Sequence, residues 1–187
     1  AVRNVPLSEA SRFGILNTNP DNSIYEFEEK PKQPKSTNAS MGIYVFNWDV
    51  LKAALIADED DENSSNDFGK NIIPNLLNAG HKMMAYNFDG YWKDVGTVDS
   101  LWDANLDLLN PKIDLNLSDS NWRIYSRTNS MPPQYVSSTA KVENSLVTDG
   151  CEIYGNLDYS ILFENVIVEE GASVEYSLVM PGAVIKK

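Results

Sequence analysis

The pattern of apolar and polar positions in the first half of the chain predicts short strands joined by turns. Residues 13–18 and 24–30 are rich in aliphatic and aromatic side chains and flank a turn cluster at residues 19–23. This arrangement favours a hairpin. Residues 40–46 and 81–88 contain similar apolar runs and are predicted to form two further strands.

Three stretches have the spacing of apolar residues that is typical of helices. Residues 47–57 and 98–109 place apolar side chains three or four positions apart, and Thr97 is a plausible N-cap for the second helix. A shorter helix is predicted at residues 75–79, because Pro74 fits only in a first helical turn.

A repeat appears in residues 112–187, after the helix-breaking Asn110-Pro111 pair. Three triplets of serine followed by two aliphatic residues recur at intervals of 15 and 17 positions, at residues 145–147, 160–162 and 177–179. Interleaved with them are short segments in which a small residue precedes an aliphatic one, at residues 149–153, 170–174 and 181–184. The pattern predicts a β-helix built of hexapeptide units, with an ordinary antiparallel β domain as the alternative.

Composition narrows the classes of protein and partner. The 187 residues have 42% hydrophobic content and a net charge of −12, with no basic cluster, which argues against a nucleic-acid partner. The single cysteine, Cys151, cannot form an internal disulfide, and a reduced, cytoplasmic setting is expected. No membrane-spanning apolar run or signal peptide is apparent. The first residue is not methionine and the end lacks a turn or cap, so we expect a piece of a longer chain.

The first candidate site is the segment at residues 91–97, where Asp94 stands between two aromatic residues and a glycine-containing turn. The segment follows a predicted strand, and open α/β sheets bind ligands at strand ends. A carboxylate there can hold a hard divalent cation that bridges to phosphate oxygens. The structural alternative is that Tyr91 and Trp92 belong to the core and that Asp94 stabilises the turn.

The second candidate site is the end of the strand at residues 24–30. Lys30 can act as a point charge on a phosphate, and Glu29 can accept hydrogen bonds from sugar hydroxyls. The alternative is a solvated charge pair. Gly42 in a predicted strand fits close approach of a ligand. The acidic run at residues 58–66 lacks the EF-hand pattern and is predicted to be a solvated, mobile loop.

These stretches resemble one enzyme family. The sequence Y-W-K-D-V-G-T at residues 91–97, together with D-F-G-K-x-I-I-P at residues 67–74, is similar to the signature of the glucose-1-phosphate adenylyltransferases. The E-K-P sequence at residues 29–31 is shared more widely among enzymes that form sugar nucleotides, and residues 40–44 resemble the family's next motif. With a weaker match at residues 9–14, five stretches occur in the family's order.

The resemblance implies an α/β fold with two domains. Residues 1–110 would form the C-terminal half of a Rossmann-like nucleotidyltransferase domain. Residues 111–187 would form a linker and a left-handed parallel β-helix of hexapeptide repeats, incomplete at its end. The resemblance also implies a homo- or hetero-tetramer under allosteric control. No nucleic-acid or membrane partner is expected, because the chain is acidic and has no apolar run of membrane-spanning length.

The reaction implied is the formation of ADP-glucose and pyrophosphate from ATP and glucose 1-phosphate, for glycogen synthesis, with Mg²⁺ as cofactor. Asp94 would hold Mg²⁺ and Lys30 would bind the sugar phosphate. The remaining residues would form the sugar pocket and its floor: Glu29, Ser40 and Gly42 for the pocket, Trp92 and Lys93 for the floor.

One part of the family's site has no counterpart in these residues. The chain contains neither a Gly-Gly pair nor a G-x-G-x-x-G sequence, so the Gly-rich nucleotide loop is missing. We therefore expect residues 1–187 alone to be inactive. The alternatives are a non-catalytic regulatory subunit and another sugar-1-phosphate nucleotidyltransferase, using UTP or dTTP. A hexapeptide-repeat acyltransferase would need a histidine near the coils, and none follows His81.

Overall fold

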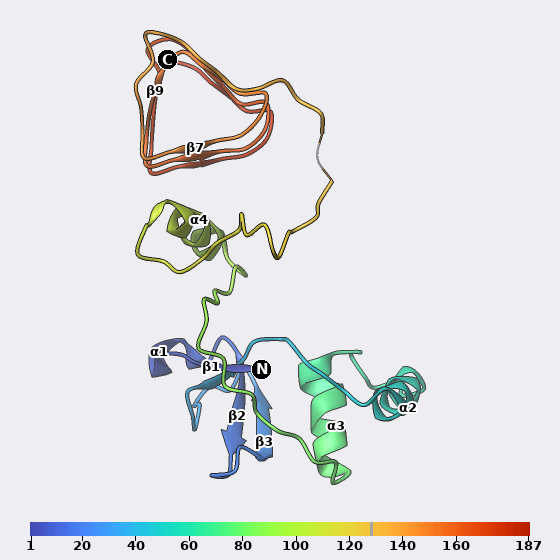
Figure 1. The fold of residues 1–187 in the computed structure, drawn as a ribbon. Coiled ribbons are helices and arrows are strands. Elements are labelled where there is room, and N and C mark those ends of the chain that lie inside the picture. Colours follow the sequence, from blue (N-terminus) through green and yellow to red (C-terminus); the bar gives the residue numbers. More distant parts are fainter. Residues whose placement is uncertain (128) are drawn as a thin grey trace. The chain divides into compact units, whose positions relative to one another are not determined.

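The chain forms two compact units. The computed structural model describes residues 1–127 and 129–187, and their contacts divide into Ala1–Asp89 and Gly90–Lys187 (Figure 1). The domain boundary expected between residues 110 and 111 stays a prediction.

The first unit is organised around a four-stranded antiparallel sheet with the strand order β1-β4-β2-β3. Its strands are β1 (Val2–Asn4), β2 (Gly14–Thr18), β3 (Ile24–Glu29) and β4 (Asn38–Ser40). The predicted hairpin is confirmed as β2 and β3, whose register pairs Gly14 with Glu29. The hairpin therefore delivers Glu29 to the end of β3.

The helices of the first unit are α1 (Leu7–Ala10), α2 (Trp48–Glu59), the π-helix η1 (Phe68–Ile72) and α3 (Ile73–Asn78). Asn47 caps α2, since its side chain accepts a hydrogen bond from the Asp49 N–H at 3.1 Å. The helix predicted at residues 75–79 is present but begins earlier, with Pro74 in its first turn as expected.

Neighbouring residues of β2 contribute to two separate cores. Leu16 packs with Phe27 and with Ile73 of α3, whereas Ile15 packs with Ala10 of α1. Successive side chains in a strand point to opposite faces. A strand that packs on both faces therefore has apolar residues at consecutive positions, as the sequence of β2 does. The sheet is covered on both faces.

The strand predicted at residues 40–46 is wrong beyond its first residue. β4 ends at Ser40, and residues 41–47 belong to neither a strand nor a helix. Gly42 has a φ of +70°, and its N–H donates to Ser40 Oγ at 3.3 Å, so the backbone turns here. A strand was predicted because the residues that follow Gly42 are β-branched and aromatic.

The strand predicted at residues 81–88 is also wrong as a continuous element. The segment forms only two isolated bridges, one between Ser23 and Met84 and one between Val2 and Asn87. It therefore lies beside the sheet without adding a full strand to it.

The second unit contains α4 (Val98–Leu106), the 3₁₀ helix η2 (Asp107–Leu109) and a parallel β-helix of about three turns. Figure 1 shows the three-sided coils end-on. Ten short strands build it: β5 (Tyr135–Val136), β6 (Val142–Glu143), β7 (Leu146–Val147), β8 (Glu152–Ile153), β9 (Asn156–Asp158), β10 (Ile161–Leu162), β11 (Ile167–Val168), β12 (Ser173–Glu175), β13 (Leu178–Val179) and β14 (Val184–Ile185).

The predicted repeat is confirmed by the register of the coils. The aliphatic residues of the three serine triplets stack in one parallel sheet, with Ile161 paired to Leu146 on one side and Leu178 on the other. The second set of repeats, at residues 149–153, 170–174 and 181–184, does not stack in one sheet as the serine triplets do. Its strands β8 and β14 share one sheet, whereas β12 belongs to another.

A serine ladder fixes one corner of the coils. Ser145 Oγ accepts from the Ser160 N–H, and Ser160 Oγ accepts from the Ser177 N–H, each at 3.1 Å. The residue before each serine has a left-handed φ between 44° and 46°. Ser145 and Ser160 therefore each satisfy a backbone donor of the next coil at the point where the chain turns.

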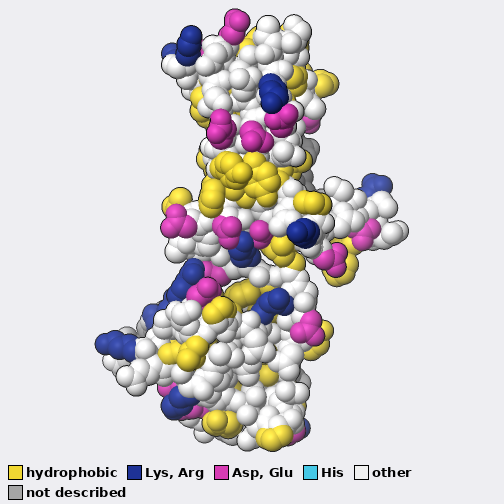
Figure 2. All heavy atoms as spheres, turned by 90° about the vertical axis from the view of Figure 1, so that its left-hand side faces the viewer, with side chains coloured by type: hydrophobic (Ala, Val, Ile, Leu, Met, Phe, Trp, Pro, Cys, Tyr) yellow, Lys and Arg dark blue, Asp and Glu magenta, His cyan; other side chains and the backbone are white. Residues whose placement is uncertain are grey.

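Helix α4 packs against β13 of the β-helix. Trp102 Nε1 of the helix donates to the Tyr176 carbonyl at 2.8 Å. Figure 2 shows a group of hydrophobic side chains between the coils and this helix. Among the described residues, no helix has both the length and the apolar character needed to cross a membrane.

Candidate functional site

Lys30 occupies a strained position at the end of β3. Its φ is +47°, in the left-handed region that disfavours a residue with a side chain, and Pro31 follows it. The Lys30 N–H donates to the Phe13 carbonyl at 3.1 Å, which holds this conformation. The Lys30 side chain is 65% exposed, and its Nζ lies 3.7 Å from Glu29 Oε1.

Two glycines provide the space around the Glu29 carboxylate. A Cβ atom added at Gly14 would lie 2.9 Å from Glu29 Oε2, and one added at Gly69 would overlap the same oxygen. Gly69 lies in η1, at the start of the predicted D-F-G-K-x-I-I-P motif. The motif therefore packs its backbone directly against the predicted sugar-binding carboxylate.

Ser40 lies at the end of β4, beside the turn at Gly42. Its Oγ lies 3.0 Å from the Tyr44 hydroxyl and accepts from the Gly42 N–H. A Cβ atom at Gly42 would meet no atom within 4 Å, so this backbone borders open space. Ser40 and Gly42 thus lie in one turn, as the resemblance implies, and the turn can present polar groups to a ligand.

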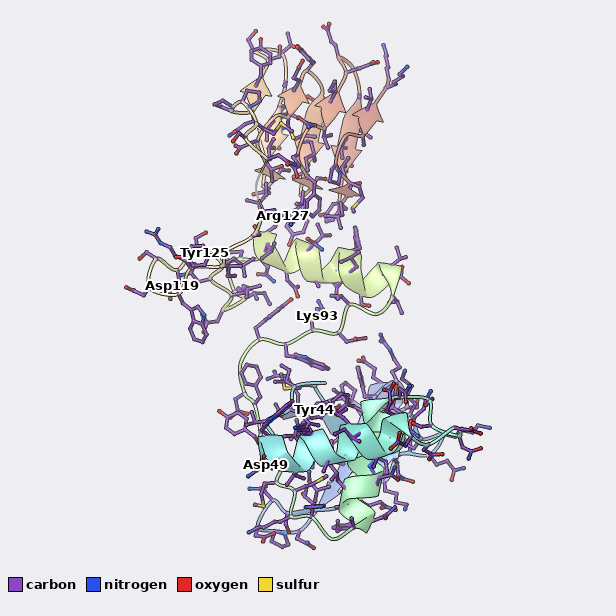
Figure 3. All side chains as sticks on the ribbon, turned by 90° about the vertical axis from the view of Figure 1, so that its right-hand side faces the viewer. Tyr44, Asp49, Lys93, Asp119, Tyr125 and Arg127 are labelled. Atoms are coloured by element: carbon purple, nitrogen blue, oxygen red, sulfur yellow. The ribbon has the colours of Figure 1, made fainter. Side chains whose placement is uncertain are left out.

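Tyr44 and Phe68 extend this part of the site. Their rings stack with centroids 5.8 Å apart, and Figure 3 shows Tyr44 beside α2. Burial raises the Tyr44 pKa, the hydrogen bond to Ser40 lowers it, and the negative charges of Glu29 and Asp67 raise it further. Asp67 accepts from the Lys70 N–H at 2.8 Å and so caps η1.

Sequence reasoning did not assign roles to Tyr44, Asp67, Phe68 or Gly69. The signal was present, because all four belong to motifs that the resemblance used. Their proximity to Glu29 could not be inferred from local sequence, since it depends on how η1 packs beside β3.

The segment at residues 91–97 has neither helix nor strand conformation and leads directly into α4. The predicted cap is confirmed, because Thr97 and Ser100 form a reciprocal capping box with hydrogen bonds of 3.1 and 3.2 Å. Trp92 and Asp94 are half-buried. A Cβ atom at Gly96 would lie 3.2 Å from Asp94 Oδ2, so the carboxylate lies over this glycine.

Lys93 and Tyr91 contact the acidic side of α4 and η2. Lys93 Nζ lies 2.7 Å from Asp107 Oδ2 and also pairs with Asp103, and the Tyr91 hydroxyl donates to Asp107 Oδ2 at 2.8 Å. Figure 3 shows Lys93 on the segment that runs beside the helix. Burial lowers the Lys93 pKa, but the two carboxylates outweigh it, so the net shift is upward.

The Tyr91 phenol provides a pH-dependent test of this cluster. Burial and the hydrogen bond to Asp107 raise its pKa from 10.0 to about 12. The folded chain therefore binds the phenol proton more tightly than the unfolded chain does. The resulting contribution to the free energy of unfolding is complete below about pH 10 and is lost as the pH rises through 12. We expect Tyr91→Phe to remove a phenol that ionises near pH 12, detected by phenolate absorbance. Loss of a phenol that ionises near pH 10 would contradict this assignment.

The role of Asp94 as a ligand of Mg²⁺ stays a prediction. In the part of the chain that the structure describes, no group of three or more His, Cys, Asp or Glu side chains is placed to hold a metal ion. Mg²⁺ usually binds through one or two carboxylates together with phosphates and water. The single Asp94 carboxylate fits that donor set.

The seven predicted site residues fall in both compact units. Glu29, Lys30, Ser40 and Gly42 lie in the first unit, and Trp92, Lys93 and Asp94 lie in the second. Within the first unit the structure brings Glu29 beside Lys30 and Ser40 beside Gly42. That the two sets form one site stays a prediction.

Comparisons with known proteins identify the two regions. Residues 1–111 match the family model described as nucleotidyl transferase, and residues 132–187 match the GlmU-like, C-terminal hexapeptide model. The second match and the parallel coils confirm the predicted left-handed β-helix of hexapeptide repeats.

Curated relatives carry the name that the sequence motifs predicted. A glucose-1-phosphate adenylyltransferase from Clostridium perfringens (strain 13 / Type A) is 57% identical over 186 residues, which cover 100% of this chain and 47% of the relative. Proteins of the same name from Bacillus cereus (strain ATCC 14579) and Bacillus mycoides (strain KBAB4) are 58% identical over 187 residues, covering 100% of this chain and 50% of each relative.

The chain therefore spans about half the length of the curated relatives it matches. The nucleotidyl transferase match covers more than half of the chain itself. These residues belong to the nucleotidyl transferase family, with a hexapeptide-repeat β-helix after the nucleotidyltransferase region.

Proposed function

We propose that this chain carries the sugar-phosphate part of an enzyme that forms ADP-glucose and pyrophosphate from ATP and glucose 1-phosphate. The proposal rests mainly on the arrangement of side chains at the end of β3. There the Glu29 carboxylate is accommodated by two glycines, and the adjacent Lys30 is held in a left-handed conformation with an exposed ammonium group. The names of the relatives support the choice of reaction.

The residues of the first unit would bind the sugar phosphate. The Lys30 ammonium offsets the phosphate charge, and the Glu29 carboxylate accepts hydrogen bonds from sugar hydroxyls. The turn containing Ser40 and Gly42 forms a wall of the pocket. These contacts orient the phosphate oxygen of glucose 1-phosphate, which attacks the α-phosphorus of ATP as pyrophosphate leaves. Such a transfer depends on positioning and charge neutralisation and needs no covalent protein nucleophile.

In the second unit, Asp94 is the proposed ligand of Mg²⁺. The ion, when bound, would polarise the α-phosphate and neutralise developing charge. Trp92 and Lys93 flank Asp94 and would shape the floor of the site. Tetrameric assembly, allosteric control and a cytoplasmic location are implied by the family resemblance and stay predictions.

We also propose that residues 1–187 alone do not catalyse the reaction. They contain no Gly-rich nucleotide loop, and the relatives are about twice as long. The test measures pyrophosphate release by these 187 residues and by the full-length protein with glucose 1-phosphate and Mg²⁺. Robust turnover by residues 1–187 would overturn this part of the proposal.

The same assay separates the candidate functions. ATP, UTP, dTTP and GTP are compared in the full-length protein, and Lys30→Ala is measured beside it. A preference for ATP, with a raised KM for glucose 1-phosphate in Lys30→Ala, would support the proposal. A preference for UTP or dTTP would identify another sugar-1-phosphate nucleotidyltransferase. No turnover with any nucleotide would favour a regulatory subunit.

The packing of Gly69 against Glu29 leads to a specific prediction. In Gly69→Ala the new methyl group would overlap Glu29 Oε2 and displace the carboxylate. Because the displaced group is the flexible end of a side chain, we expect little loss of stability. We expect the KM for glucose 1-phosphate to rise about tenfold, as for loss of a hydrogen bond to a charged group. Steady-state kinetics of the full-length protein would measure it.

Two variants control for this prediction. Glu29→Gln should raise the same KM, and Gly69→Ala should add little once Glu29 has been changed. An unchanged KM in Gly69→Ala, with Glu29→Gln impaired, would show that the carboxylate relaxes without loss of binding.

A further inference from the structure

Asp107 connects two side chains of the segment that carries Asp94. Its Oδ2 atom accepts from the Tyr91 hydroxyl at 2.8 Å and from Lys93 Nζ at 2.7 Å. We propose that Asp107 is a positioning residue, which holds the Asp94 carboxylate in place through Tyr91 and Lys93. The proposal rests on the role of Asp94 in the proposed function.

The Lys93–Asp107 pair is more buried than an ordinary surface ion pair, whereas the Asp103 side chain is 56% exposed. The Asp107 side chain is 17% exposed and that of Lys93 is 29% exposed. Hydrogen bonds between charged groups are stronger than neutral ones, and partial burial reduces their screening by salt. Tyr91 adds a third member, so displacement of Asp107 would break two contacts at once.

The negative charge at the end of α4 explains why the Lys93 side chain forms its ion pairs there. Asp103 lies in the C-terminal half of this helix, Asp107 is the residue that ends it, and its last turn contains no basic residue. Carboxylates are unfavourable near the negative end of the helix dipole. Lys93 supplies the compensating positive charge from outside the helix and contacts both carboxylates.

The segment is also fixed on the other side of Asp94. Thr97 and Ser100 form the capping box at the start of α4. Asp94 therefore lies between Lys93, which is bound to Asp107, and Thr97, which is bound to Ser100. Only Val95 and Gly96 separate Asp94 from the capping box, so the backbone that carries its carboxylate is attached to one helix at both ends.

The central experiment compares Asp107→Asn with Asp107→Glu in the full-length protein. Loss of the charge should lower kcat and raise the Mg²⁺ concentration for half-maximal rate, each by about tenfold or more, as for groups that orient metal ligands. The KM for glucose 1-phosphate should change less than about twofold. Asp107→Glu should restore part of the loss. Asp99→Asn, at an exposed position in the first turn of α4, is the matched control.

A double variant separates positioning from direct binding by Lys93. If Lys93 acts through Asp107, then Lys93→Met combined with Asp107→Leu should be no worse than Asp107→Leu alone. A further rise in the KM for glucose 1-phosphate in the double variant would instead show that Lys93 binds the sugar phosphate. That result would overturn the positioning role.

A readout without turnover keeps this proposal separate from the proposed function. In the 187-residue chain, Asp107→Leu should accelerate hydrogen–deuterium exchange of the peptide covering residues 91–97 by about tenfold, whereas Asp99→Asn should not. Unchanged exchange would overturn the proposal. Absence of ADP-glucose formation by the unmodified full-length protein, with accelerated exchange in Asp107→Leu, would reject the proposed function and leave the attachment of the segment supported.

Discussion

Asp94→Asn is expected to lower the rate of ADP-glucose formation by the full-length protein by roughly a hundredfold or more. The asparagine has the same shape but lacks the negative charge that would hold Mg²⁺. A catalytic metal ion contributes several kcal/mol to stabilising transition-state charge, and each 1.4 kcal/mol corresponds to about a factor of ten in rate. The loss should appear in kcat and in the dependence on Mg²⁺, measured by pyrophosphate release.

Two comparisons make this result specific. Asp89→Asn changes an exposed carboxylate near the end of the first unit and should leave the rate within about twofold. Thermal unfolding of Asp94→Asn should remain close to that of the unmodified protein, because the substitution preserves volume. Normal turnover and normal Mg²⁺ dependence in Asp94→Asn would rule out the proposed metal-binding role.

The β-helix was predictable because its repeat is local. Each coil pairs the same positions of the sequence, so the serine triplets at intervals of 15 and 17 residues already described the register of Leu146, Ile161 and Leu178. The cap at Thr97 was predictable for the same reason, since the Ser100 that completes the capping box lies three positions away. Local patterns indicate local structure well.

The strand predictions at residues 40–46 and 81–88 failed for a different reason. Apolar and β-branched residues favour a strand only when a neighbouring strand pairs with them. Gly42 turns the chain after Ser40, and the later segment forms only isolated bridges. Whether a segment finds a partner is decided by tertiary structure.

In the candidate site, too, local features were predictable from the sequence and tertiary contacts were not. Glu29 and Lys30 were identified from the end of one strand, but the packing of Gly14 and Gly69 around the carboxylate required the fold. Likewise, the sequence places Asp107 fourteen residues after Lys93 with no indication that they meet. The motifs therefore located the chemical groups, and the structure supplied the residues that hold them.

Leu162→Ala is expected to destabilise the β-helix by about 2–5 kcal/mol, the usual range for a leucine truncated in a core. The Leu162 side chain is completely buried and belongs to the inner cluster of the coils. Its register partners, Val147 and Val179, are fixed by parallel pairing on both sides. Since the neighbouring strands cannot move inwards without breaking this pairing, most of the cavity should remain.

Leu146→Ala is the matched control for this result, because Leu146 lies in the same sheet but is 44% exposed. Urea unfolding of the 187-residue chain, followed by circular dichroism, should show a lower midpoint for Leu162→Ala and a loss below about 1 kcal/mol for Leu146→Ala. Each coil is stabilised mainly by its neighbours, so a defect in the middle coil weakens the contacts on both sides. Equal losses in the two variants would mean that Leu162 does not hold the coils together from within.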